Sequence, residues 1–262
     1  MPTLTICSWN VNGLRATIKT GDFPNWLATT SPDIAGMQEI KATEDQVASP
    51  TWFDLGYEST WHCAERPGYS GVLLLTKRQP EAVRCGINIP DFDREGRVIE
   101  ADYPWFTLLT AYFPNGGNKG VRLDYKFAFY DAFIQRIEAL RAEGRPVIFM
   151  GDLNVAHTEM DVARPDEALK GTGFLPEERA WLDRLTDLGY VDTFRALHPD
   201  ERDAYSYWDA WRDRRARNVG WRIDYIWVSE DLLPSVRRAF IQADVMGSDH
   251  CPVGIELEVP GD

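Results

Sequence analysis

Two short motifs place carboxylate, carboxamide and imidazole groups where they could support hydrolysis. An apolar run at 147–150 leads through a glycine to Asp152 and, two residues later, to Asn154. Near the C-terminus, His250 directly follows Asp249, a setting that no other histidine of the chain has. A carboxylate can align or deprotonate water, and histidine titrates near neutral pH, so these residue types suit acid–base chemistry. Taken alone, each motif is also typical of a strand-ending turn or a structural histidine.

Further polar residues follow other apolar runs. Glu39 comes directly after the run at 33–38, and Asn10 and Asn12 follow the first run of the chain. A carboxylate oxygen is a hard ligand that suits Mg²⁺, which typically takes one or two carboxylates and completes its shell with water and substrate phosphate. The alternative is that Glu39 is an ordinary surface residue and that the two asparagines form a turn.

The elements that must position these residues alternate along the chain. Short runs of β-branched and aromatic residues predict strands, and apolar residues at three- and four-residue spacing predict two helices. The expected strands are 3–9, 33–38, 70–76, 97–102, 106–112, 146–150, 190–193, 222–228 and 253–259, and the expected helices are 122–142 and 176–188. Because most of the candidate residues lie at or just beyond strand ends, we expect them to converge on one rim of an α/β structure. With no linker or low-complexity tract, residues 1–262 are expected to form one domain.

Charge is distributed unevenly along the chain. The 41 acidic and 28 basic residues give a formal net charge of −13, which at first argues against a partner rich in phosphates. The stretch 212–222 nevertheless holds five arginines against one aspartate, and it follows an aromatic-rich stretch at 205–211. Arginines among aromatics suit a surface that holds phosphates and covers exposed bases or sugars. The plainer interpretation is a basic loop beside core aromatics.

The compartment is indicated by the cysteines and by the N-terminal residues. The four cysteines, Cys7, Cys63, Cys85 and Cys251, are far apart in sequence, which predicts reduced thiols rather than a disulfide framework. The chain also begins without the basic and apolar regions of a signal peptide, and it contains no apolar run of membrane-spanning length. We therefore expect a cytoplasmic protein with no membrane partner, associated with the nucleoid if the host is a prokaryote.

Nine collinear motifs between about residues 4 and 258 are similar to those of one known family. They are Trp9–Arg15, Gln38–Glu39, Gly68–Val72, Glu95–Val98, Ala111–Gly116, Gly151–His157, Gly173–Arg179, Gly220–Tyr225 and Gly247–Pro252. In this order they resemble the exonuclease III family of abasic-site (AP) endonucleases, within the DNase I-like endonuclease/exonuclease/phosphatase superfamily. The resemblance implies a four-layered α/β sandwich, in which two packed mixed β-sheets are flanked by helices.

The resemblance also implies an activity. It would be Mg²⁺-dependent hydrolysis, with Mn²⁺ expected to substitute, of the phosphodiester 5′ to an abasic site, leaving a 3′-hydroxyl for base excision repair. Accompanying 3′-phosphodiesterase and 3′→5′ exonuclease activities are expected. The partner would be double-stranded DNA that contains abasic sites or blocked 3′ ends, and the protein would act as a monomer.

Two sets of residue roles carry over by motif. The residues expected at or near the metal ion, with Glu39 as the principal ligand, are Asn10, Glu39, Asp152, Asn154, Asp249 and His250. In the catalytic set, Asp224 would orient His250, and Tyr112 would stabilise the charge of a phosphorane-like transition state. Asp152 would align or deprotonate the attacking water, which Asn154 would position. Whether Asp152 or His250 is the general base stays open at this point, because a protonated His250 would clamp the phosphate instead.

DNA recognition is expected around the same site. Tyr207, Trp221 and Ile223 match the walls of the apolar pocket that receives the flipped abasic sugar. Trp211 falls where some relatives carry a residue that wedges into DNA from the minor groove. Further candidates for phosphate or groove contacts are Asn12, Arg15, Lys41, Tyr69, Arg97, Asn115, Lys119, Lys126 and Arg215. The resemblance thus implies a basic, aromatic rim around an acidic metal pit.

Two other functions would use some of the same residues. Another phosphoesterase of the superfamily, of the inositol-phosphate phosphatase or sphingomyelinase type, would use similar metal and His/Asp groups, but the 221–224 and 9–15 motifs argue against it. A non-catalytic homologue that only binds damaged DNA is the second alternative. A homologue of that kind would be free to lose the carboxylates and the histidine that this chain keeps.

Overall fold

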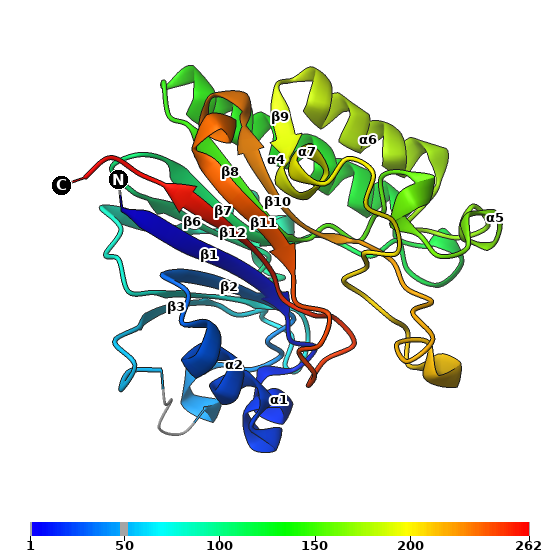
Figure 1. The fold of residues 1–262 in the computed structure, drawn as a ribbon, viewed down its shortest axis with the longest axis horizontal. Helices are drawn as coiled ribbons and strands as arrows, with labels where there is room; N and C mark the ends of the chain where they lie inside the picture. Colours follow the sequence, from blue (N-terminus) through cyan, green and yellow to red (C-terminus); the bar gives the residue numbers. More distant parts are fainter. Residues whose placement is uncertain (1, 48–51, 262) are drawn as a thin grey trace.

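Two β-sheets pack face to face, with helices on their outer sides (Figure 1). They are seen in a computed structural model that describes residues 2–47 and 52–261. Sheet A has six strands, which are, in spatial order, β11 (Val236–Ile241), β12 (Val253–Glu258), β1 (Thr3–Asn10), β2 (Ile34–Gln38), β4 (Val72–Thr76) and β3 (Glu58–His62). Sheet B also has six, in the order β5 (Ala82–Cys85), β6 (Val98–Asp102), β7 (Thr107–Tyr112), β8 (Val147–Asp152), β10 (Asp224–Ser229) and β9 (Tyr190–Asp192).

Helices complete the outer layers. On sheet A lie α1 (Leu14–Thr20) and α2 (Asp22–Thr30), and on sheet B lie α4 (Leu123–Ala142) and α6 (Pro176–Asp187) (Figure 1). Shorter helices are α3 (Pro90–Asp93), α5 (Pro165–Ala168) and α7 (Thr193–Leu197), and 3₁₀ turns lie at Glu44–Gln46, Asn118–Gly120, Glu159–Asp161, Trp211–Asp213 and Glu230–Ser235. The helix–sheet–sheet–helix order is the four-layered α/β sandwich expected of the DNase I-like fold.

The central core lies between the sheets. Buried apolar side chains meet there from both sides, with Ile6 and Leu74 on sheet A facing a cluster that includes Leu108, Ile148 and Ile226 on sheet B. Each sheet buries its second face under helices, so the central strands are apolar on both faces. This double burial explains why the central strands read as continuous apolar runs in the sequence.

The two predicted helices have clear local causes. In α4, Phe129, Phe133, Ile137 and Leu140 recur at three- and four-residue spacing and are buried against sheet B. Helix α6 starts with a proline at its first position, where the missing N–H costs nothing, and acidic residues occupy its first turn. Both helices end within one residue of the prediction.

All nine predicted strands are present, with ends within two residues of the prediction. Strands β3, β5 and β11 were not predicted, and neither were the short helices α1 and α2. β3 and β5 are edge strands, and β11 is the edge of sheet A, so all three carry charged or half-exposed side chains. Their sequences therefore lack the apolar run that identifies a central strand.

Candidate active site

Three candidate residues are neighbours on sheet B. The parallel pairing of β7 with β8 places Tyr112 opposite Asp152, and the antiparallel pairing of β10 with β8 places Asp224 opposite the same Asp152. On sheet A, Asn10 is the last residue of β1, and Glu39 follows the last residue of β2. Parallel β1 and β2 end at the same rim, so the predicted convergence of strand ends occurs.

Asn10 connects the two sheets at this rim. Its side chain is fully buried, and its Nδ2 donates to Glu39 Oε1 at 3.0 Å and to Asp152 Oδ2 at 2.8 Å. Its Oδ1 accepts a hydrogen bond from the backbone N–H of Asn12. One amide group thereby sets the separation of two carboxylates that come from different sheets.

His250 reaches the site from the segment that precedes β12. Its Nδ1 lies 2.8 Å from Asp224 Oδ2, and its Nε2 lies 3.9 Å from Asp152 Oδ2. The Ser206 hydroxyl donates to Asp224 Oδ2 at 2.6 Å and so holds that carboxylate in place. Burial alone would lower the pKa of His250, but the facing carboxylates, Asp224 first, outweigh burial and raise it. The imidazole is therefore stabilised as a cation.

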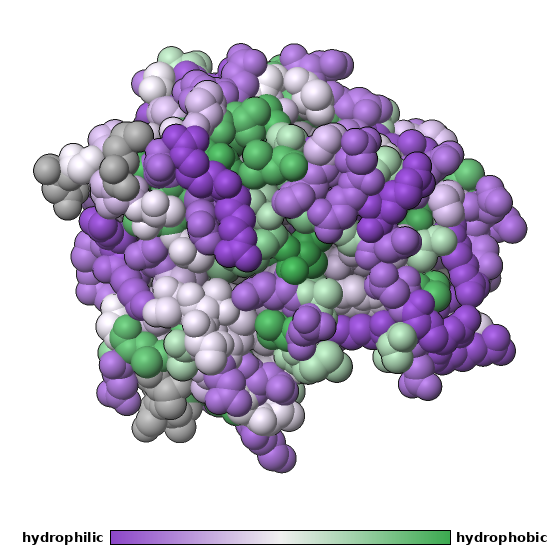
Figure 2. Space-filling view, in the orientation of Figure 1, coloured by the Kyte–Doolittle hydropathy of each residue, from purple (hydrophilic) through white to green (hydrophobic). Residues whose placement is uncertain are grey.

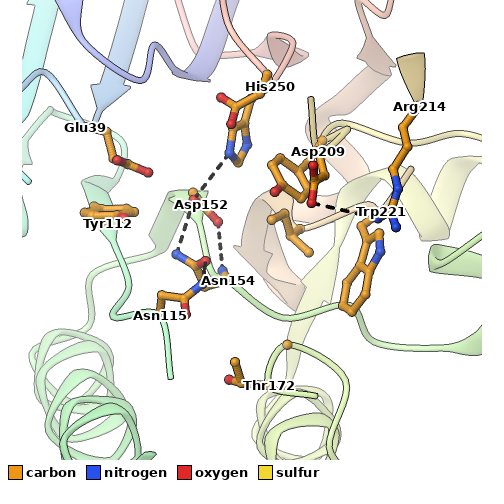
Figure 3. Close-up of a pocket in the computed structure, with 14 residues that line it drawn as sticks. Glu39, Tyr112, Asn115, Asp152, Asn154, Thr172, Asp209, Arg214, Trp221 and His250 are labelled. Carbon is orange, nitrogen blue, oxygen red and sulfur yellow. Dashed lines mark hydrogen bonds and ion pairs between the residues drawn. The ribbon is translucent and has the colours of Figure 1, made fainter. Parts of the chain in front are cut away.

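Asp152 lies at the centre of the constellation (Figure 3). Burial raises the pKa of its carboxyl, and the neighbouring carboxylates act in the same direction against His250. Asn154 donates from its backbone N–H to Asp152 Oδ1 at 2.8 Å and from its side chain to Oδ2 at 3.3 Å. Asn115 in turn donates to Asn154 Oδ1 at 2.9 Å. A carboxylate of raised basicity, oriented on both oxygens, is suited to accept a proton from water.

A cavity of about 300 Å³ opens beside these groups. One end holds Glu39, Asp152 and His250, and the other end is bounded by Trp221 (Figure 3). The complete lining is Glu39, Tyr112, Asn115, Asp152, Asn154, Thr172, Gly173, Tyr207, Asp209, Arg214, Trp221, Ile223, Asp249 and His250. The reactive groups and the predicted apolar walls therefore belong to one continuous cavity.

The donor set fits a metal ion. One ligand atom each from Glu39, Asp152 and His250 can be chosen so that all three lie within 4.8 Å of one another. The ion pair with Asp224 favours the protonated imidazole, which leaves the oxygens of Glu39 and Asp152 as the donors that a hard cation prefers. Glu39 also forms an ion pair with a lysine, since Lys41 Nζ lies 2.8 Å from its Oε2.

Asp249 and Asn12 lie at the edge of this acidic group. Asp249 lines the cavity, and its Oδ1 accepts hydrogen bonds from Asn12 Nδ2 at 3.0 Å and from Ser248 Oγ at 3.2 Å. Asn12 also accepts a hydrogen bond from Lys41. These contacts connect the segment after the C-terminal end of β1 to the segment before β12.

Three of the predicted DNA contacts have side chains that bind partners inside the protein. Lys126 has no exposed surface and pairs with Glu178. Arg97 is 2% exposed and donates to the carbonyl of Tyr112 and to Glu95. Arg215 is half-buried and donates to the carbonyls of three residues in the 243–248 segment. The buried Lys126 and Arg97 are therefore poorly placed to reach a phosphate, whereas Arg215 keeps part of its side chain exposed.

The other predicted contacts remain at the surface. Arg15, Asn12, Asn115 and Lys119 are exposed, and Lys41 and Tyr69 are partly exposed. Trp211 is 53% exposed, with the guanidinium groups of Arg212 and Arg214 at 4.0 and 5.2 Å from its ring centre. Its loop, gold in Figure 1, projects from the body of the protein, and the same region is strongly hydrophilic in Figure 2.

Some residues of the site were not identified from the sequence. Ser206, Thr172 and Asp209 are small or acidic residues outside any distinctive pattern, and their roles come only from what the fold places beside them. Arg214 belongs to the arginine-rich stretch, so charge clustering was a signal that could have found it.

Comparison with known proteins identifies the family. The model of the Endonuclease/Exonuclease/phosphatase family matches residues 7–250. The chain belongs to this family. Within residues 2–47 and 52–261, no helix of this family member has the length and apolar character needed to cross a membrane.

Curated relatives match nearly the whole chain. An exodeoxyribonuclease of Bacillus subtilis is 40% identical over 98% of this chain and 100% of its own length. The DNA repair nuclease APEX1 of Danio rerio is 42% identical over 98% of this chain and 83% of its own length. Recombination repair protein 1 of Drosophila melanogaster is 41% identical, but the match spans only 37% of that longer protein.

A solved structure agrees with the family assignment. The AP endonuclease LMAP of Leishmania major superposes with a TM-score of 0.87 at 29% identity, covering 98% of this chain and 88% of that one. The two-sheet architecture is therefore shared with an experimentally determined member of the family.

Proposed function

We propose that the protein is a metal-dependent AP endonuclease of DNA repair, which hydrolyses the phosphodiester 5′ to an abasic site and leaves a 3′-hydroxyl. The observation that carries this proposal is the single cavity that joins Asp152 and His250 to the apolar side chains of Trp221 and Ile223. Hydrolytic groups alone would suit many phosphoesters, whereas the adjoining apolar wall suits a sugar that has lost its base. The names of the similar proteins support the same activity.

In the proposed reaction Asp152 is the general base. It lies beside His250, whose ion pair with Asp224 favours the cationic imidazole. A cation cannot accept the proton of the attacking water, but it stabilises negative charge that develops on the phosphate oxygens. Asn154 helps to orient the Asp152 carboxylate, and Tyr112 lines the same cavity with its hydroxyl. The geometry thus supports one of the two alternatives that the sequence left open.

We propose that the metal ion is Mg²⁺, with Mn²⁺ as a substitute, and that Glu39 and Asp152 hold it. Hard carboxylate oxygens are the donors that both ions take in phosphoesterase sites. When bound, the ion would act as a Lewis acid that stabilises charge on phosphate and leaving-group oxygens. Asn10 would keep the two carboxylates together, and Asp249 would add negative charge at the edge of the site.

The sugar pocket would be formed by Tyr207, Trp221 and Ile223. Backbone hydrogen bonds between Tyr207 and Trp221, in both directions, hold two of these walls together. Phe174 packs under the indole of Trp221, with ring centres 6.3 Å apart. Phe174 supports this wall from behind. Steric fit, and not hydrogen bonding, would therefore exclude a nucleotide that still carries its base.

DNA would lie across the rim of the cavity. Arg15, Lys41 and Lys119 are the predicted phosphate contacts that keep accessible side chains, with Tyr69 and Asn115 as groove or backbone contacts. Trp211 would enter the minor groove from its projecting loop. Because the chain carries a net charge of −13, binding to intact DNA should be weak and strongly dependent on salt.

The protein would act as a cytoplasmic, single-domain monomer on double-stranded DNA. It would also process blocked 3′ ends by 3′-phosphodiesterase and 3′→5′ exonuclease action.

The decisive assay uses a duplex with one tetrahydrofuran abasic analogue, incubated with Mg²⁺ or with EDTA. An undamaged duplex and a duplex with a 3′ mismatch serve as matched substrates, and Glu39→Gln is the inactive control. We expect a metal-dependent nick on the 5′ side of the analogue and a 3′-hydroxyl product. The absence of such a nick in the presence of Mg²⁺ or Mn²⁺ would overturn the proposal.

A further inference from the structure

A buried ion pair lies directly behind the candidate active site. Lys126 of α4 and Glu178 of α6 meet at 2.5 Å, and neither side chain has any exposed surface. Removing two charges from water is costly, and their attraction often does no more than offset that cost. The pair is therefore not explained by stability alone, and its other contacts show what it does.

Lys126 holds the backbone of a catalytic segment. Its Nζ donates to the carbonyl oxygen of Asn154 at 2.7 Å. Asn154 has a φ of +53°, in the left-handed region that asparagine adopts more readily than other residues with a Cβ. Lys126 fixes its carbonyl from inside the protein, while the Asn154 side chain reaches Asp152.

Glu178 holds an adjoining segment of the cavity lining. Its Oε1 accepts a hydrogen bond from Thr172 Oγ1 at 2.7 Å, and its Oε2 accepts one from the backbone N–H of Gly173 at 2.6 Å. Gly173 has a φ of +98°, and a Cβ placed there would lie 3.1 Å from the Trp221 indole. The position of Gly173 therefore decides how closely the backbone approaches the pocket wall.

The two segments are also joined directly. The carbonyl oxygen of Gly173 accepts a hydrogen bond from the N–H of Ala156, two residues beyond Asn154. These contacts form a closed ring. Lys126 binds Asn154, Ala156 near Asn154 binds Gly173, Gly173 binds Glu178, and Glu178 pairs with Lys126. Thr172, Gly173 and Asn154 all line the cavity.

We infer that Lys126 and Glu178 are positioning residues that set the catalytic segment at Asn154 and the pocket wall at Gly173 at a defined distance from each other. They touch no substrate. Their effect is on rate and selectivity, because Asn154 contacts the proposed base Asp152 and Gly173 adjoins the Trp221 wall of the proposed sugar pocket. The inference rests on the proposed AP endonuclease function for its kinetic test, but the structural coupling can be tested without any activity.

The kinetic test uses four variants. Lys126→Met and Glu178→Gln each break the pair, and Lys126→Arg keeps a cation that can reach the same acceptors. The double variant Lys126→Met with Glu178→Leu replaces the pair by apolar groups of similar volume, an exchange that often restores stability. Arg136→Met is the matched control, because Arg136 is also on α4 and pairs with the buried Glu100, but it has no contact with Asn154 or Gly173.

We expect Lys126→Met and Glu178→Gln to lower kcat on the tetrahydrofuran duplex by about tenfold or more, as misplaced catalytic groups do. KM should change little, and the preference for the abasic over the unmodified duplex should fall. The double variant should regain thermal stability without regaining kcat or selectivity, while Lys126→Arg should recover part of both. If the double variant recovered activity together with stability, or if kcat and selectivity were unchanged in Lys126→Met, the inference would be overturned.

Hydrogen exchange followed by mass spectrometry tests the coupling without turnover. Lys126→Met should increase amide exchange in the peptides covering 153–157 and 171–175 together, and Arg136→Met should not. Unchanged exchange in either peptide would contradict the inference. If the wild-type enzyme failed to cleave the abasic duplex, the proposed function would be wrong, and the exchange data would still decide whether the ion pair couples the two segments.

Discussion

His250 Nε2 and Asp152 Oδ2 face each other across 3.9 Å, close enough for electrostatic attraction but too far apart for a hydrogen bond. On its other side His250 is held at 2.8 Å by Asp224. The gap therefore lies between a cation and a carboxylate of raised pKa, and an oxygen atom beside the line that joins them could contact both. This relationship divides the proposed work between two residues, with proton transfer assigned to Asp152 and charge stabilisation to His250.

The first prediction concerns Asp152. Asp152→Asn keeps the size of the side chain but removes the proton acceptor and weakens one of the two proposed metal ligands. We therefore expect kcat to fall by at least about 10²–10⁴-fold, the range attributed to general base catalysis. Affinity for the abasic duplex should stay close to that of the wild type. Single-turnover cleavage and fluorescence anisotropy measure the two quantities. Asp131→Asn, at an exposed position on α4, is the control and should cleave normally. Near-normal cleavage by Asp152→Asn would exclude this carboxylate as the base.

The second prediction concerns the dependence of activity on pH. The proposed mechanism needs protonated His250, so activity should be lost as the pH rises through the raised pKa of this group. Asp224→Asn removes the facing charge and lowers that pKa, so the alkaline loss should begin about one pH unit or more lower than in the wild type. Profiles of kcat/KM against pH at saturating Mg²⁺ measure the shift. An alkaline limb that stayed in place or moved to higher pH would contradict the assignment.

The third prediction concerns the exposed indole of Trp211. Replacing it with alanine should weaken binding to an abasic duplex by about tenfold, because stacking of one aromatic ring on a base is worth about 1–3 kcal/mol. Trp211→Phe keeps a ring and should lose much less. Binding is best measured with catalysis blocked, by replacing Mg²⁺ with Ca²⁺ or by using the Glu39→Gln background. Equal affinities of Trp211→Ala and the wild type would show that the residue does not enter the DNA.

The fourth prediction concerns which exposed basic residues contact DNA phosphates. Arg15→Ala and Lys119→Ala should each reduce the slope of log Kd against log salt concentration by about one, as expected when one phosphate contact is lost. Arg238→Ala is the control, since this exposed arginine lies on edge strand β11 and pairs with Glu256. Titrations at several salt concentrations give the slopes. A slope that changed equally in all three variants would indicate a general charge effect instead of local contacts.

The fifth prediction concerns folding stability and pH. Burial alone would raise the pKa of Asp161, but Arg222 and Arg195 outweigh burial and hold it well below its usual range. A lowered pKa in the folded state adds stability that is complete above the unfolded value of about 4 and is lost as the pH falls toward the folded value. Asp161→Asn should therefore lower the free energy of unfolding by about 3–5 kcal/mol at pH 7, and by less at pH 3. Urea unfolding at both pH values tests this, and an equal loss at both would contradict it.

Much of the fold was predictable because central strands are buried on both faces. Val147–Asp152 and Thr107–Tyr112 are apolar runs that end in polar residues, and that pattern identified both the strands and the positions of Asp152 and Tyr112. The edge strand Glu58–His62 is mostly polar, with Trp61 as its one large apolar residue, and none of its side chains is fully buried. Its place in the sheet depends on pairing with β4, a partner that its own sequence does not specify.

The exposure of the candidate DNA contacts was less predictable than the convergence of the candidate catalytic residues. Nothing in the sequence around Lys126 distinguishes it from an exposed lysine on a helix. Its partner Glu178 lies 52 residues away in sequence. Arg97 lies between two strands, and only the fold reveals that it stacks on Tyr112 and donates to its carbonyl. A residue's charge can be read from the sequence, but whether that charge meets solvent or a buried partner depends on tertiary contacts.

The hydrogen bond from Asn10 to Asp152 joins the first strand of sheet A to a central strand of sheet B, and it has a consequence for how the activity arises during folding. The groups proposed to bind metal and activate water come from both halves of the sandwich, so neither half holds a complete set. A nascent or partly unfolded chain, in which the sheets have not yet docked, should therefore be unable to nick DNA. In a nuclease, that dependence confines strand cleavage to correctly assembled molecules.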